Sequence, residues 1–414
     1  MRKMRKTARV LFAAALLIGS GFFLSANGLN LNGVGSKAIA MGGAFIGQAD
    51  DYSAVFWNPA GLSLMKETSV SLFGTDLIPS ATYQFGGIEV KSENKMYLSG
   101  AAGFFKPISD KLVMGFLVYV PAGSGAKWNG EDLKILTKNT PLEWESQIAV
   151  VTISPAVSYK VSDILSVGAT LNINYGMMKL KKPALYPADS LTPMFAKQYS
   201  EDSTAWGFGA TFGLLLKPNE NLSIGLTVRT PSKINFKGSA ENGLAPILLH
   251  ASETSDIERE ATWPLWVGFG ISLKATDKLT INADAQYTNW KKVDKITATY
   301  TDPVWQAALA EKAALELNWQ DKIQYRIGLE YKLSEKLALR AGYYYDPVVG
   351  PDETFSIILP QFTYNAVTAG FGYRTKKLSL DACLEYLMGK ERTIGSNVYS
   401  MNILVPNIAV TYRF

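Results

Sequence analysis

Apolar residues recur at every second position through most of the chain after residue 70. Between 165 and 175 the odd-numbered positions are apolar, whereas the even-numbered positions are Ser, Gly, Thr and Asn. The stretch 279–288 repeats the pattern, with Asn, Asp and Gln on its polar face. Because side chains of a strand alternate between two faces, each stretch predicts a two-faced strand. A polar face this rich in amides and carboxylates indicates a wet lumen rather than the core of a soluble sandwich.

Counting stretches in this way gives about fourteen strands, an even number as in bacterial outer-membrane barrels. Their expected spans are 68–85, 96–106, 111–120, 147–160, 164–180, 203–217, 221–237, 261–275, 278–294, 322–333, 336–347, 363–375, 377–391 and 402–414. Short connections alternate with long ones at 121–146, 181–202, 238–260, 295–321, 348–362 and 391–401. This asymmetry predicts an all-β, transmembrane, antiparallel barrel whose short turns face the periplasm.

The stretch Ala40–Leu62 differs from the rest because neither a period of 2 nor one of 3.6 persists in it. Glycines at 42, 43, 47 and 61 supply flexible backbone, Asn58 can bond nearby backbone, and Pro59 stops a preceding helix. These residues predict a compact irregular plug that sits inside the barrel lumen.

The first residues have the pattern of a secretory signal peptide, with five basic side chains followed by the apolar run Val10–Leu24. We expect cleavage near Ala26; the alternative is an uncleaved N-terminal anchor. The chain then divides into a signal peptide (1–26), a plug or hatch (27–67) and an outer-membrane barrel (68–414).

Removing residues 1–26 changes the charge argument. The whole chain carries +5, from 41 basic and 36 acidic residues, and the first 26 hold five basic and no acidic ones. The remainder is therefore about neutral, and nucleic acid as a partner loses its compositional support.

The single cysteine, Cys383, excludes an intramolecular disulfide. A closed barrel can do without one because every strand edge is paired.

The motif DDYSAVFWNPAGL, preceded by AMGGAF, resembles the hatch of the FadL/TodX family of outer-membrane channels for long-chain fatty acids and other hydrophobic compounds. The family's Asn-Pro-Ala stands at residues 58–60, and the stretches 263–290, 319–347 and 405–414 are also similar to this family. The resemblance implies an inward kink in the third strand, through which ligand leaves sideways. Gly115 and Pro121-Ala122-Gly123 are the residues that could permit it.

Little in the sequence supports catalysis. The only histidine, His250, lies in an expected loop, and Cys383 lies in the middle of an expected strand. A Cys/His pair or a metal cluster cannot be assembled from these residues, so we expect no enzyme activity, no catalytic residue, no metal and no cofactor. An outer-membrane lipase would have to use His250 as its base.

Three groups of residues are candidates for a ligand path. The first is in the hatch: Phe45, Phe56, Trp57, Asn58, Pro59 and Ala60. The aromatic members could line the path or only pack the plug against the wall. The second group is apolar and lies in expected extracellular loops: Leu191, Met194, Phe195, Leu244, Ile247, Leu248 and Leu249. These residues could capture an apolar ligand or pack on each other as a lid; either way we expect a helix or turn there.

The third group consists of charges on the inward face: Arg229, Asp284, Arg326, Glu330 and Arg340. An arginine could hold a ligand carboxylate. Alternatively, these charges pair with one another or with Asp50 and Asp51 to hold the hatch, because unpaired buried charges are costly.

Together these features predict a monomeric outer-membrane channel for passive uptake of a hydrophobic small molecule, with long-chain fatty acids preferred. Aromatic or alkane hydrocarbons are the alternative cargo, and a general porin or a structural barrel is the alternative class. Outer-membrane lipids surround such a barrel. The terminal Tyr412-Arg413-Phe414 resembles the signal read by the barrel assembly machinery.

Overall fold

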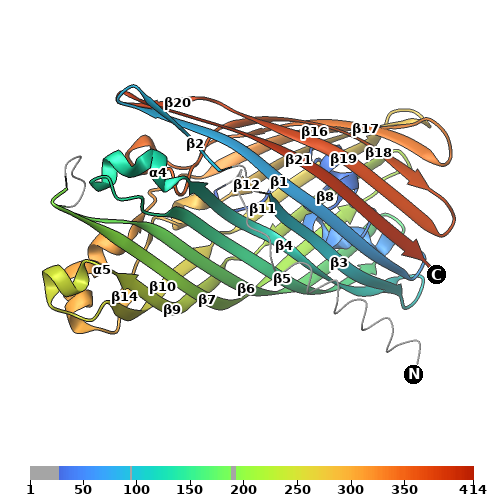
Figure 1. The fold of residues 1–414 in the computed structure, drawn as a ribbon. Helices are drawn as coiled ribbons and strands as arrows, with labels where there is room; N and C mark the ends of the chain where they lie inside the picture. Colours follow the sequence, from blue (N-terminus) through green and yellow to red (C-terminus); the bar gives the residue numbers. More distant parts are fainter. Residues whose placement is uncertain (1–27, 94–95, 188–192) are drawn as a thin grey trace.

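The computed structural model describes residues 28–93, 96–187 and 193–414 of the chain, so the expected signal peptide lies outside the described residues. The protein is a 14-stranded antiparallel β-barrel (Figure 1), as the alternation predicts. The wall strands are β1 (Ser69–Phe85), β3 (Tyr97–Pro107), β4 (Leu112–Trp128), β5 (Trp144–Lys160), β6 (Leu165–Tyr186), β7 (Phe195–Leu216), β8 (Leu222–Arg229) continued by β9 (Ser232–Asn242), β10 (Thr254–Trp263) continued by β11 (Trp266–Lys274), β12 (Leu279–Thr288), β16 (Lys322–Lys332), β17 (Leu337–Asp346), β18 (Tyr364–Arg374), β19 (Leu378–Gly389) and β21 (Asn397–Arg413).

The barrel closes where its first strand meets its last. β1 pairs with β21 from Ser69 opposite Arg413 to Gln84 opposite Val398. The short turns gather at the end of the barrel that also holds the C-terminus (Figure 1). They form locally, because a turn hydroxyl or amide accepts from the backbone N–H three residues later. Ser109 accepts from Leu112 at 3.2 Å, for example.

The outward face of the wall is apolar, and large side chains such as Phe208, Ile327 and Ile408 are exposed on it. This surface is the lipid-facing band expected of a transmembrane barrel. The described part of the chain has no helix that is both long enough and apolar enough to cross a membrane.

The opposite end of the barrel extends further than the sequence predicts. β6 and β7 each have 22 residues, so the expected loop 181–202 is wrong over much of its length. The expected loop 238–260 likewise contains the end of β9 and the start of β10. β4 also runs through to Trp128, well beyond its expected end at 120.

Short elements cover the long-loop end. They are β2 (Ile88–Lys91), α4 (Gly130–Leu133), η2 (Lys134–Thr137), η3 (Ala245–Leu249), η4 (Trp290–Lys292), β13 (Lys295–Ile296), β14 (Thr299–Tyr300), α5 (Pro303–Ala313), β15 (Leu315–Glu316), η5 (Asp352–Thr354) and β20 (Arg392–Ile394). Helix α5 begins after Asp302, whose carboxylate accepts from the Val304 and Trp305 N–H groups, with Pro303 at the first helical position.

The plug lies inside the barrel toward the short-turn end, where its short helices are visible in blue (Figure 1). It contains α2 (Ser36–Ala40), α3 (Ala54–Trp57) and η1 (Pro59–Leu64). Phe45, Trp57 and Leu62 are almost completely buried in one apolar cluster with wall residues such as Phe105 and Leu117. The plug therefore fills the lumen at this level, as the sequence predicts.

Candidate functional site: the plug and the break in the wall

Asn58 joins two parts of the plug to the wall. Its Nδ2 donates to the carbonyl of Ile46 and to that of Leu214 in β7, both at 3.0 Å, and its Oδ1 accepts from the Ala60 N–H at 3.2 Å. Pro59 occupies the first position of η1, where no N–H is required. The Asn-Pro-Ala motif therefore starts a helical turn and ties it to a strand, and Asn58 is fully buried.

Glycines in the wall let the plug approach the strand backbone. A Cβ at Gly213 would lie 2.1 Å from the Asn58 Oδ1, and one at Gly342 would lie 2.1 Å from the Gly42 nitrogen. Both contacts are far shorter than any real Cβ contact, so only glycine fits at either position. Sequence reasoning missed this role, because a strand glycine carries no sign of what approaches it.

Two lumen charges of the sequence analysis bind plug backbone. The Asp284 carboxylate accepts from the N–H groups of Phe45 at 2.9 Å and Ile46 at 3.0 Å. Arg326 donates to the Gly42 carbonyl at 2.9 Å, and its guanidinium lies 4.4 Å from the centre of the Tyr344 ring. The plug has little regular structure, so these side chains satisfy backbone groups that no helix ladder satisfies.

Arg229 is arranged differently. It donates through Nη2 to the Phe56 carbonyl at 2.8 Å, and its guanidinium lies between the rings of Phe56 at 4.6 Å and Trp266 at 4.9 Å. Its Nε has no hydrogen-bond partner among the described residues. No carboxylate forms an ion pair with Arg229 in the described part of the chain. This arginine therefore keeps hydrogen-bonding capacity for a ligand.

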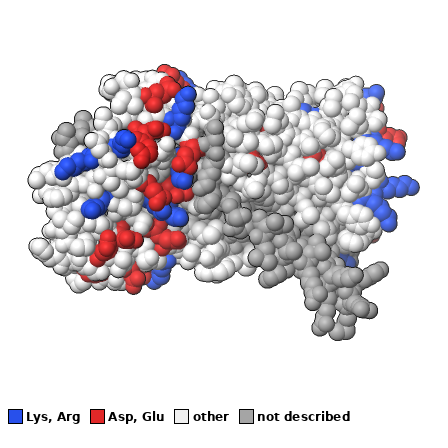
Figure 2. All heavy atoms as spheres, in the orientation of Figure 1, with Lys and Arg blue, Asp and Glu red and all other residues white. Residues whose placement is uncertain are grey.

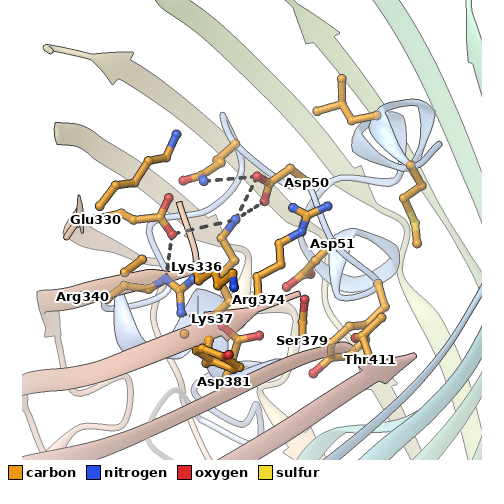
Figure 3. Close-up of a pocket in the computed structure, with 18 of the residues that line it drawn as sticks. Lys37, Asp50, Asp51, Glu330, Lys336, Arg340, Arg374, Ser379, Asp381 and Thr411 are labelled. Atoms are coloured by element: carbon orange, nitrogen blue, oxygen red, sulfur yellow. Dashed lines mark hydrogen bonds and ion pairs between the residues drawn. The ribbon is translucent and has the colours of Figure 1, made fainter. Parts of the chain in front are cut away.

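Glu330 and Arg340 pair with each other at 2.7 Å, and Arg340 also binds Asp381 at 2.6 Å. Asp50 pairs with Lys37 of α2 at 2.7 Å, and the Lys37 ammonium lies 3.9 Å from Glu330 (Figure 3). The structure thus links Asp50 to the wall through Lys37, whereas Arg229, Arg326 and Asp284 contact plug backbone instead of the plug carboxylates.

A polar vestibule of about 820 Å³ opens at the short-turn end, and its lining includes Lys37, Asp50, Glu330 and Arg340. Burial alone would raise the pKa of Asp50, but the adjacent Lys37 ammonium holds it below its ordinary value. Burial raises the pKa of Asp51 to about 6, with Lys37 opposing the shift. The Asp51 carboxylate accepts from the N–H and hydroxyl of Ser53 at 2.8 and 2.6 Å.

The wall is interrupted beside the plug, in the third strand. β3 and β4 pair from Pro107 opposite Val113 to Ala101 opposite Tyr119 and then separate. The register of β4 against β5 shifts between Tyr119 and Ala122. Pro121 cannot donate a ladder bond, which favours the break at this position. Gly115 pairs regularly with Ala156, so of the two positions that could permit a kink only the one at Pro121-Ala122-Gly123 is irregular.

The N-terminal segment Leu29–Leu31 takes the place of β3 beyond this break. The Leu31 N–H donates to the Pro121 carbonyl at 3.0 Å, and the Gly123 N–H donates to the Leu29 carbonyl at 2.9 Å. Asn30 lies opposite Ala122 in an antiparallel bridge. The segment thus closes an edge that β3 leaves open. Sequence reasoning missed it, since three residues show no period.

A small polar cavity of about 40 Å³ lies under this segment. Asn30, Pro121, Arg229 and Trp263 are among the residues that line it. The Trp263 Nε1–H, like the Arg229 Nε, has no partner among the described residues. Two N–H donors without a partner at the lining of one cavity suit an anionic oxygen.

The expected capture residues lie at the long-loop end. Leu191 lies outside the described residues. Met194 and Phe195 are exposed, and Phe195 begins β7, so a helix or turn at Phe195 is wrong. The second stretch is a short π-helix, η3, as expected for a helix or turn. Leu244 is buried, Leu249 packs against a cluster that contains Trp305, and Ile247 is exposed; Leu248 is half-buried.

The hatch aromatic residues connect the plug to the break. Phe56 packs edge-on against Trp57 at 4.8 Å and against Tyr119 at 5.9 Å between ring centres. Tyr119 is the last β4 residue paired with β3.

Among the described residues, no group of three or more His, Cys, Asp or Glu side chains is placed to hold a metal ion.

A plugged, lipid-facing barrel with a break in its wall defines an outer-membrane transport protein. The chain belongs to the family described as "Outer membrane protein transport protein (OMPP1/FadL/TodX)", which matches residues 12–412. It is therefore an outer-membrane transporter of hydrophobic compounds and not an enzyme.

Two proteins with different names are similar in sequence to this chain along most of its length. The chain is 26% identical to outer membrane protein P1 of Haemophilus influenzae, over 94% of this chain and 91% of that protein. It is 21% identical to the long-chain fatty acid transport protein of Salmonella typhi, over 90% of each.

Two solved structures share the fold. The Pseudomonas aeruginosa FadL homologue has a TM-score of 0.80 at 16% identity, covering 94% of this chain and all of that one. The P. putida toluene transporter TodX has a TM-score of 0.74 at 18% identity, covering 93% and 99%.

Proposed function

We propose that this protein is a passive channel whose preferred cargo is a long-chain fatty acid. The observation that carries the proposal is the polar cavity beneath the wall break, whose lining includes Arg229. A fatty acid has one anionic end and a long apolar chain. The cavity offers donors for the carboxylate, and the adjacent N-terminal segment buries two leucines beside β4.

The apolar chain of the ligand would replace Leu29 and Leu31 along the open edge of β4. Both side chains are buried there, at 4% and 6% exposure. Burying each methylene of a ligand gains roughly 0.8 kcal/mol, which drives capture without an energy source. Release into the membrane then follows sideways through the break, and a shift of the plug around Asn58-Pro59-Ala60 accompanies it.

Hydrocarbon transport is the second candidate function. The rings of Phe56, Tyr119 and Trp266 around Arg229 would suit a flat aromatic ligand equally well. The two cargoes differ in their need for the guanidinium, because a hydrocarbon has no group that accepts a hydrogen bond.

The test compares oleate and toluene on purified wild-type barrel and on an Arg229→Gln variant. We expect the variant to bind and transport oleate about tenfold more weakly, the loss typical of one charge-assisted hydrogen bond, and toluene unchanged. Arg392→Gln at the long-loop end removes the same charge far from the cavity and serves as the control.

Equal affinity of wild type for both ligands, unchanged by Arg229→Gln, would favour the hydrocarbon function. A general porin predicts large ion conductance of the wild type in planar bilayers, whereas a filled lumen predicts little. A structural barrel predicts binding of neither compound.

A further inference from the structure

The short-turn end of the barrel carries a concentrated positive charge. We call this the basic rim: residues 64–69, 106–112, 160–165, 216–222, 274–279, 332–337, 374–378 and 411–414. The basic rim contains thirteen Lys or Arg residues and six Asp or Glu residues, a net charge of +7.

The rest of the barrel does not share this charge. Five of the 41 basic residues precede residue 28, so residues 28–414 hold 36 basic and 36 acidic side chains and are neutral as a whole. The part of residues 28–414 that lies outside the basic rim therefore carries −7. Figure 2 shows Lys and Arg gathered at one end, while Asp and Glu are interspersed with them at the other.

Local acids neutralise only a part of the basic rim. Lys160 pairs with Asp163 and Lys274 with Asp277, at 2.7 and 3.2 Å, and Arg413 lies 3.8 Å from Glu67. These contacts use three of the six acids. Ten bases then face three remaining acids, and most of the ten are exposed, including Lys332, Lys336, Lys376 and Lys377.

The basic rim lies at the depth of lipid headgroups. Three exposed tyrosines, Tyr331, Tyr373 and Tyr412, lie on the outward face near the short-turn ends of β16, β18 and β21, at 43%, 41% and 42% exposure. The next residue in each case is basic, and these residues line the mouth of the vestibule: Lys332, Arg374 and Arg413. Interfacial tyrosines mark the headgroup level of a membrane, so this end of the barrel lies at that level.

We propose that the basic rim binds the phosphate groups of anionic phospholipids in the periplasmic leaflet and selects them over zwitterionic lipids. The bases are spread around the circumference, with at least one in every short turn and one at each end of the barrel sequence. A ring of this shape matches a ring of lipids, whereas a single docked protein would need a patch on one side.

The test measures lipid selectivity of the full barrel in vesicles of phosphatidylcholine containing spin-labelled phosphatidylglycerol or phosphatidylcholine as the probe. The rim variant replaces Lys332, Lys336, Lys376 and Lys377 by Gln. The matched control replaces Lys134, Lys291, Lys292 and Lys312, four exposed lysines at the opposite end, by Gln.

We expect wild type and control to restrict the anionic probe at least about fivefold more strongly than the neutral one, as for one lysine near an anionic surface. The rim variant and high salt should bring the ratio close to one. A wild-type ratio of one, or a preference that the rim variant keeps, would overturn the proposal. Loss of preference in the control would also overturn it.

Docking of an acidic periplasmic protein is the competing explanation. It predicts equal lipid selectivity in all three proteins, together with loss of that partner in the rim variant only.

Barrel folding is checked by the shift in gel mobility on heating. The lipid measurement does not depend on transport, so it stands whatever cargo the channel carries.

Discussion

The N-terminal segment Leu29–Leu31 should have to leave β4 for transport to occur. Replacing Asn30 and Ala122 by Cys tests this, because the two residues face each other in an antiparallel bridge. The flanking bonds, from Leu31 to Pro121 and from Gly123 to Leu29, make this the non-hydrogen-bonded type of pair. In such pairs the Cα atoms lie about 4.5 Å apart, within the range of a disulfide.

The structure gives the size of the effect. Two backbone hydrogen bonds at about 1 kcal/mol each and two buried leucines at about 2 kcal/mol each hold the segment with about 6 kcal/mol. Release returns roughly 1.5 kcal/mol of conformational entropy per residue over three residues, or about 4.5 kcal/mol. The remaining ~1.5 kcal/mol leaves the segment detached in roughly 7% of molecules. A disulfide removes this population, so uptake should fall at least about tenfold.

The assay is oleate uptake into proteoliposomes, with and without a reductant. Uptake should be lost in the oxidised double variant and recovered on reduction, while each single variant behaves as wild type. The control disulfide replaces Ser71 and Thr411, which face each other across the permanent β1–β21 seam with hydroxyls 2.8 Å apart. Full uptake through the oxidised Asn30/Ala122 protein would refute a moving N-terminal segment.

Three further outcomes follow from the plug. Asn58→Ala removes the bonds to Ile46, Leu214 and Ala60, so we expect lower uptake and higher ion conductance. The barrel should stay folded, as checked by its shift in gel mobility on heating. Unchanged uptake would argue against a working hatch. Asp51 has its pKa raised to about 6, above the ordinary 3.8, so the seated plug binds this proton more tightly and loses stability as pH rises from about 4 to 6. Conductance should therefore rise over that interval in wild type and stay flat in Asp51→Asn. His250→Ala should leave uptake unchanged, because His250 only follows η3; a collapse would revive an enzymatic role.

The strand alternation predicts the barrel well where lipid contacts one face and the lumen contacts the other. It fails above the membrane, where the outward side chains of tall strands face water and become charged. Lys237 of β9 pairs with Glu258 of β10 at 2.6 Å on this outer surface, so neither strand shows an apolar face there. The expected ends of β4, β6 and β9 consequently come too early, and the loops after them are expected to be too long. The opposite error occurs at β12, which ends at Thr288 although a strand is expected to reach 294.

Strand alternation also predicts that the lumen charges face inward, but it does not predict how deep in the barrel each one lies. The inward positions of Asp284, Arg326 and Arg340 are predicted correctly, yet their partners depend on which part of the plug reaches each level. Arg340 meets two acids near the vestibule, whereas Asp284 meets plug N–H groups. Pairing across hundreds of residues cannot be derived from a local pattern.

The distribution of contacts decides which part of the plug can move. Asn58, Asp284, Arg326 and Thr368 tie its centre to the wall through at least six hydrogen bonds, and wall glycines bring strand backbone against it. Moving the centre would break bonds worth about 1 kcal/mol each and expose groups that no other partner satisfies. The N-terminal segment is held by two backbone bonds and ends beside the polar cavity. A ligand that binds there competes with the weakest attachment of the plug, so the path opens at the wall before the plug shifts around Asn58.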